Sequence, residues 1–64
     1  MSEVEVAFFD ANDNTQLHAA KFNEVEFQAL LKARQFKIGE KKYQPRDHFY
    51  NIDMNVFIIN VTKL

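Results

Sequence analysis

The side chains best suited to acid–base chemistry in this chain are its two histidines, His18 and His48. A pair of histidines can act as general acid and general base, as in metal-independent ribonucleases, with Lys41 or Arg46 holding a phosphate. The two histidines are 30 residues apart and fall on different predicted strands. Nothing in the sequence brings them together, so a ribonuclease-like enzyme is the least supported of three hypotheses for function.

A second candidate for chemistry is the polar segment that begins at Asp10. Asp10, Asn12 and Asn14 stand at alternate positions, which is how a calcium-binding loop begins. An EF-hand loop then requires glycine at its sixth position and glutamate at its twelfth, where this chain has Thr15 and Lys21. Asp and Asn also favour tight turns, because their side chains hydrogen-bond nearby backbone groups. We interpret the segment as a hairpin turn and expect no metal site.

The composition excludes most other catalytic motifs. The chain has no cysteine, a single glycine and a single serine, Ser2. These counts rule out Cys-based zinc sites, thiol redox chemistry, glycine-rich phosphate loops and nucleophile motifs of the G-x-S-x-G kind. The sequence therefore predicts a protein without catalytic residues and without a cofactor.

The composition also indicates the class of the molecule. The chain has 64 residues, of which 47% are apolar and 14% aromatic, and this is enough for one folded domain spanning 1–64. No apolar run approaches the roughly 20 residues of a membrane-spanning helix. The first residues are acidic, unlike the basic start of a signal peptide. We expect a cytoplasmic protein without a membrane partner.

Charge is distributed unevenly along the chain, although the net charge is only −1. Residues 1–31 carry six acids and one base, whereas residues 32–46 carry six bases and one acid. The basic segment is either an electropositive patch or is neutralised by the acidic one. A patch at residues 37–50 could bind nucleic acid, because basic groups neutralise phosphates and aromatic rings stack on bases. The residues of this alternative are Lys37, Lys41, Lys42, Tyr43 and Arg46.

The hydrophobic pattern predicts the elements that would position these residues. Period-two alternation predicts strands at 4–9, 16–21, 36–38, 41–43, 48–50 and 56–62. A helix is predicted over 24–35, because Asn23 and Glu26 have the spacing of a capping box and an apolar row follows them. Gly39 predicts a two-residue hairpin turn of type II′. Pro45 predicts a bulge or a sheet edge, because proline cannot donate to a strand ladder.

This order of elements predicts an α+β fold. We expect a small antiparallel β-sheet of four to five strands with one α-helix packed on one face, in a ββαββ-like arrangement. In the second strand, His18 and Ala20 are expected to point away from the core. The predicted core consists of Val4, Val6, Phe8, Leu17, Phe27, Leu30, Leu31, Ile38, Phe57, Ile59 and Val61.

One feature of this fold indicates a function. A single helix covers one face of a sheet, and an exposed apolar patch on the other face usually marks a contact site. The predicted partner-binding residues on that face are Phe9, Tyr50, Val56 and Ile58. The main hypothesis is a small non-enzymatic protein–protein interaction module that acts as a regulator or inhibitor. It would work as a homodimer or by docking on a larger protein, as accessory proteins of phages and mobile elements do.

Overall fold

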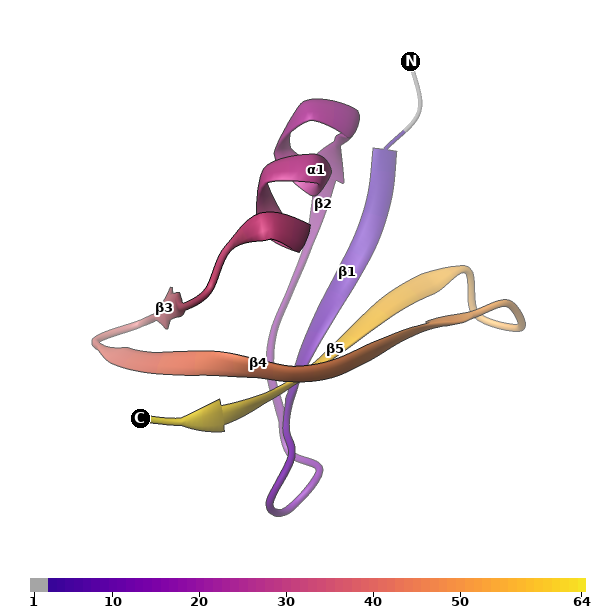
Figure 1. Ribbon diagram of the computed structural model, residues 1–64. Helices are drawn as coiled ribbons and strands as arrows, with labels where there is room; N and C mark the ends of the chain where they lie inside the picture. The colour runs from indigo at the N-terminus through magenta and orange to yellow at the C-terminus, as the bar shows by residue number, and fades with distance from the viewer. Residues whose placement is uncertain (1–2) are drawn as a thin grey trace.

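The computed structural model describes residues 3–64, which form one twisted sheet with one helix (Figure 1). Met1 and Ser2, which belong to the predicted 1–64 domain, lie outside the described residues. The elements in chain order are β1 (Glu3–Asp10), β2 (Gln16–Asn23), α1 (Glu24–Lys32), β3 (Phe36–Ile38), β4 (Lys41–Asn51) and β5 (Val56–Lys63). The predicted α+β class with a single helix is confirmed. Within residues 3–64, no helix has the length and apolar character needed to cross a membrane.

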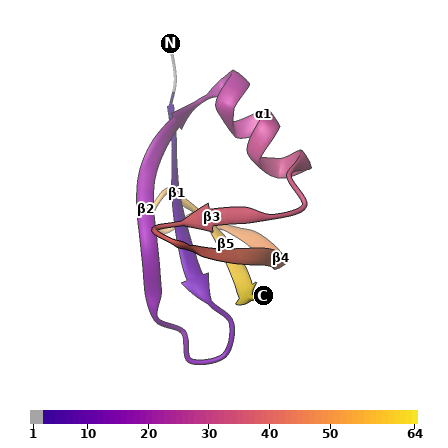
Figure 2. The same cartoon turned by 90° about the vertical axis from the view of Figure 1, so that its left-hand side faces the viewer.

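The strands form one sheet in the order β2-β1-β5-β4-β3. All neighbours are antiparallel except β1 and β5, which lie side by side in parallel. The sheet is therefore mixed rather than wholly antiparallel, because the first and last strands meet at its centre. Helix α1 packs on β2 and β1, and it lies on only one side of the sheet (Figure 2).

The helix begins with the predicted capping box. The Asn23 side chain accepts a hydrogen bond from the Glu26 backbone N–H at 2.8 Å, and the Glu26 carboxylate accepts one from the Asn23 N–H at 3.0 Å. These bonds satisfy two backbone donors that a helix start otherwise leaves free. The helix ends at Lys32, three residues earlier than predicted, and Ala33 is already extended with ψ 140°. The chain then runs to β3, where the Phe36 ring meets Phe8 edge-on.

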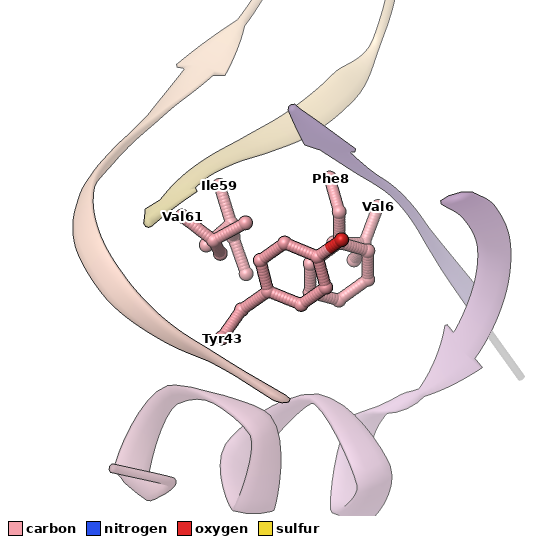
Figure 3. Close-up of a cluster of buried hydrophobic side chains, with 5 residues drawn as sticks. All are labelled: Val6, Phe8, Tyr43, Ile59 and Val61. Carbon is pink, nitrogen blue, oxygen red and sulfur yellow. The ribbon is translucent and has the colours of Figure 1, made fainter. Parts of the chain in front are cut away.

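The core lies between α1 and the sheet. Its buried centre consists of Val6, Phe8, Tyr43, Ile59 and Val61, whose side chains point toward one another (Figure 3). The partly buried side chains around it are Val4, Leu17, Phe22, Phe27, Leu30, Phe36, Ile38 and Phe57. Every predicted core residue belongs to this cluster except Leu31, which is 41% exposed. The short helix packs through one stripe, at Phe27 and Leu30, and Leu31 lies outside it.

The turns use residues that tolerate left-handed backbone. Gly39 has φ +64° in the two-residue turn between the paired residues Ile38 and Lys41, as the sequence predicts. Asn14 and Asn55 have φ of 62° and 55° in the other two hairpin turns, which contain no glycine. Asparagine is among the residues that adopt this conformation most readily. All three reversals are therefore encoded locally.

Two bulges interrupt the alternation of side chains between the faces. On β2, Leu17 is the extra residue, because Phe8 pairs with His18 while Phe9 pairs with Gln16. His18 therefore lies on the helix side with Phe8, and so does Ala20, so their predicted outward orientation is wrong. On β4 the extra residue is Arg46, directly after Pro45, where the sequence predicts a bulge or an edge.

Candidate interaction surface

The face of the sheet turned away from α1 is called the open face. Two rows of cross-strand neighbours lie on it, because their neighbours along each strand point into the core. The first row consists of Ala19, Ala7, Ile58 and Phe49. The second row consists of Gln16, Phe9, Asn60 and Asp47. The first row is wholly apolar, and the second adds an aromatic ring flanked by polar groups.

The open face contains a shallow hollow between these rows. It is lined by Phe9, Asn14, Phe49, Ile58 and Asn60 and has a volume of about 240 Å³. Typical small-molecule sites are larger, at roughly 300–1,000 Å³, and enclose most of the ligand. A wide hollow of this size with an apolar floor fits a side chain of a protein partner better than a metabolite.

One of the two asparagines that line the hollow, Asn60, is already paired within the chain. The Asn60 Nδ2 group donates a hydrogen bond to Asp47 Oδ1 at 2.7 Å, and the two residues are direct cross-strand neighbours. A polar pair that is satisfied in this way does not require a ligand to complete it. Recognition at the hollow therefore depends on its apolar floor.

Exposed apolar side chains also gather at the end of the sheet where β4 leads into β5, on both faces. Phe49 is 51% exposed and Tyr50 is 48% exposed near the end of β4. Ile52 and Met54, in the turn that joins β4 to β5, are 77% and 72% exposed. Four of the large exposed hydrophobic side chains thus fall within six consecutive residues. Concentration of apolar surface at one place is typical of a contact site.

The predicted partner-binding residues are only partly brought together. Phe9 and Ile58 line the hollow, as the prediction requires. Val56 alternates with Ile58 onto the same face, but it is only 8% exposed and offers little surface. Tyr50 pairs with Phe57, and its ring centroid lies 6.4 Å from that ring on the helix side. The predicted placement of Tyr50 on the open face is therefore wrong.

The bulge at Arg46 explains this error and a related omission. Uninterrupted alternation from Tyr43 would place Phe49 on the helix side and Tyr50 on the open face. The extra residue shifts the alternation by one position, so Phe49 joins Ile58 on the open face. Phe49 is thus the surface residue that the sequence-based assignment missed. Proline followed by a polar residue inside a strand is the signal that could have indicated it.

Tyr43, the aromatic residue of the predicted nucleic-acid-binding set, is not accessible at the surface. Tyr43 is 5% exposed and belongs to the core, so its ring cannot stack on a base. Lys37 and Lys42 are direct cross-strand neighbours, whereas Lys41 pairs with Ile38 on the other face. The exposed lysines are thus divided between the two faces of the β3–β4 hairpin.

The two histidines occupy one row of the sheet but do not meet. His18 pairs with Phe8, Phe8 with Ile59, and Ile59 with His48. Three strand spacings separate the two histidines, roughly 14 Å, with two core side chains between them. Each ring instead lies near a phenylalanine: the ring centroids are 5.2 Å apart for His48 and Phe57 and 6.1 Å apart for His18 and Phe8. This geometry does not form the acid–base pair that the enzyme hypothesis requires.

The polar segment after Asp10 closes the β1–β2 hairpin with its own side chains. The Asp10 carboxylate accepts a hydrogen bond from the Asn12 N–H at 2.8 Å, and the Asp13 carboxylate accepts one from the Thr15 N–H at 3.0 Å. Hydrogen bonds from the Thr15 hydroxyl and backbone lower the pKa of Asp13. Among residues 3–64, no three His, Asp or Glu side chains lie close enough together to hold a metal ion.

Comparison with known proteins adds no further assignment. No protein family model matches the chain, and no curated protein or solved structure is significantly similar to it. The arrangement of the residues themselves is thus the basis for any proposal about function.

Proposed function

We propose that this protein is a small non-enzymatic interaction module that self-associates through the surface around Phe49. The observation that carries the proposal is a half-exposed aromatic ring beside an apolar hollow, on the side of the sheet that α1 leaves uncovered. A module of this kind acts through what it binds, which fits a regulator or an inhibitor.

The energetics predict a moderate affinity. Complete burial of a phenylalanine side chain contributes roughly 1.5–3 kcal/mol, and about half of the Phe49 surface remains to be buried. In a two-fold assembly every contact occurs twice, so the two half-exposed Phe49 rings together contribute roughly 1.5–3 kcal/mol. Micromolar affinity requires about 8 kcal/mol in total, so neighbouring apolar residues must contribute as well.

The test is the mass of the purified chain in solution, measured by sedimentation equilibrium. The wild-type particle should exceed the 7.6 kDa of one chain and grow heavier with concentration. Phe49→Asp should return the mass to that of a monomer, because a carboxylate would have to be desolvated at the contact. Circular dichroism should show that this variant keeps its fold, since the replaced side chain is half-exposed.

The matched control is Val25→Asp, which places the same charge on an apolar side chain that is 77% exposed on α1. This variant should associate as the wild type does. A wild-type chain that remains at 7.6 kDa up to about 1 mM would overturn the proposal, since weaker association has no functional weight at cellular concentrations. An equal loss of self-association in Phe49→Asp and Val25→Asp would also contradict the proposal, because the effect would then come from the added charge alone.

A further inference from the structure

We infer that two copies of the chain pair antiparallel along the free edge of β4, about a two-fold axis at Phe49. This inference rests on the proposed function, and it names the partner as a second copy and the contact as a strand edge. The combined assembly would be one continuous sheet, with the two hollows on the same side of it.

The edge of β4 is free over its second half. β3 pairs only with Lys41–Tyr43, so within residues 3–64 the stretch Asp47–Asn51 has a strand neighbour only on its β5 side. Natural sheets protect their edges with lysine, proline and bulges. Directly before Asp47, where β3 no longer pairs with β4, the strand has two of these features, Pro45 and the bulge at Arg46. The second half has none of them, and it is the half that carries exposed aromatic rings.

The hydrogen bonds of the central strands show which backbone groups of β4 are free. The Ala11 N–H donates to the Val61 carbonyl at 2.8 Å, so the backbone polar groups of Val61 face β1. Successive residues of a strand direct these groups to alternate sides. Ile58, three residues earlier, therefore directs its groups toward β4, where it pairs with Phe49. The backbone polar groups of Phe49 are consequently used inside the sheet.

The residues on either side of Phe49 have the opposite orientation. His48 and Tyr50 thus present their backbone N–H and C=O groups at the free edge. An antiparallel partner centred on Phe49 matches His48 with Tyr50 of the second copy and Tyr50 with its His48. Each of these two matches exchanges a pair of backbone hydrogen bonds, four in all. The same register places Asp47 opposite Asn51 of the second copy, so every residue of the free edge is paired.

The side chains agree with this register on both faces. Phe49 meets Phe49 of the second copy as a non-hydrogen-bonded pair, with Cα atoms about 4.5 Å apart, where side chains contact most closely. On the helix side, the rings of His48 and Tyr50 already flank Phe57, with centroids 5.2 and 6.4 Å from it. The match of His48 with Tyr50 therefore continues an aromatic surface across the contact.

Charge is also complementary in this register. The residue opposite Ile52 is Arg46 of the second copy, so the turn that carries Asp53 lies alongside the basic bulge of the second copy. The two-fold axis repeats this pairing of opposite charges on the other side. The exposed Ile52 and Met54 side chains are brought against the second copy by the same arrangement.

Disulfide cross-linking tests the register directly, because the chain has no cysteine of its own. A His48→Cys chain carrying a size tag is mixed with an untagged Tyr50→Cys chain and oxidised mildly. Each replacement removes one ring from the contact and should weaken association. The edge hydrogen bonds come from the backbone and Phe49 is retained, so mild oxidation should still trap the paired chains. The mixture should give linked mixed dimers, because opposed Cα atoms lie within the roughly 4.4–6.8 Å that a disulfide spans.

Each variant alone should link poorly, because identical residues are then diagonal neighbours with Cα atoms roughly 7–8 Å apart. Val25→Cys serves as the control for random collision. A chain that associates but links through Ile58→Cys instead would show stacking of the open faces. That result overturns the edge pairing and leaves the proposed self-association intact. A chain that stays monomeric at all concentrations overturns both proposals.

Discussion

The two faces of the sheet use the same residue types for different purposes. Phe8 and Ile59 lie on the helix side and are 3% and 2% exposed, at the centre of the core. Their sequence neighbours of the same type, Phe9 and Ile58, lie on the open face and line the hollow. This difference in burial arises because α1 packs on only one face of the sheet (Figure 2). For these two pairs of residues, burial thus follows the face of the sheet rather than the residue type.

The largest expected effect separates Phe8 from Phe9. Phe8→Ala should lower the free energy of unfolding by roughly 3–5 kcal/mol, because it opens a cavity in a closed core. A loss of this size is comparable with the whole stability of a small domain, so the variant should be largely unfolded. Phe9→Ala should cost much less, because Phe9 lies on the open face and is only partly buried. Urea denaturation of dilute samples measures both effects, and equal losses would show that the open face is also core.

The local features of the fold are those that the sequence predicted well. The capping box at Asn23 and Glu26 and the hairpin turn at Gly39 each depend on residues a few positions apart. Their physical causes, a backbone donor to be satisfied and a positive φ, act within one turn of chain. The strands and the helix could therefore be placed, although the helix ends earlier because Phe36 has to reach the core.

The features that could not be predicted depend on distant pairing. The parallel contact of β1 with β5 joins residues about 50 positions apart, and no local pattern encodes it. No residue signals the bulge at Leu17. Pro45 predicts a bulge or an edge nearby, but the alignment of β4 with β5 decides that Arg46 is the extra residue. Because one extra residue exchanges the faces of all residues beyond it, the bulge at Arg46 alone moved Phe49 onto the candidate site and Tyr50 away from it.

The smallest expected effect concerns the β1–β2 turn, which follows the strand that carries Phe8 and Phe9. The pKa of Asp13 is lowered below its usual 3.8 by hydrogen bonds from Thr15. A lowered folded-state pKa means that the carboxylate stabilises the fold above its unfolded-state pKa. This contribution is lost as the pH falls through the folded-state value.

Thermal unfolding of the wild type and Asp13→Asn between about pH 6 and pH 2 checks this expectation. The asparagine has no carboxylate to protonate. The wild type should therefore be more stable than Asp13→Asn near pH 6, and this difference in stability should vanish near pH 2. The effect should be small, because Asp13 is on the surface and solvent screens its charge. A difference that does not change with pH would mean that the charge of Asp13 plays no part in the turn.

The most direct test of the central claim is an amide NMR spectrum recorded over a dilution series. The claim is that the uncovered side of the sheet, and not the helix, binds the partner. On dilution, we expect the amide resonances of His48, Phe49, Tyr50 and Ile58 to shift together while those of α1 stay fixed. Shifts concentrated in α1, or a spectrum that does not change from about 1 mM downward, would contradict the account.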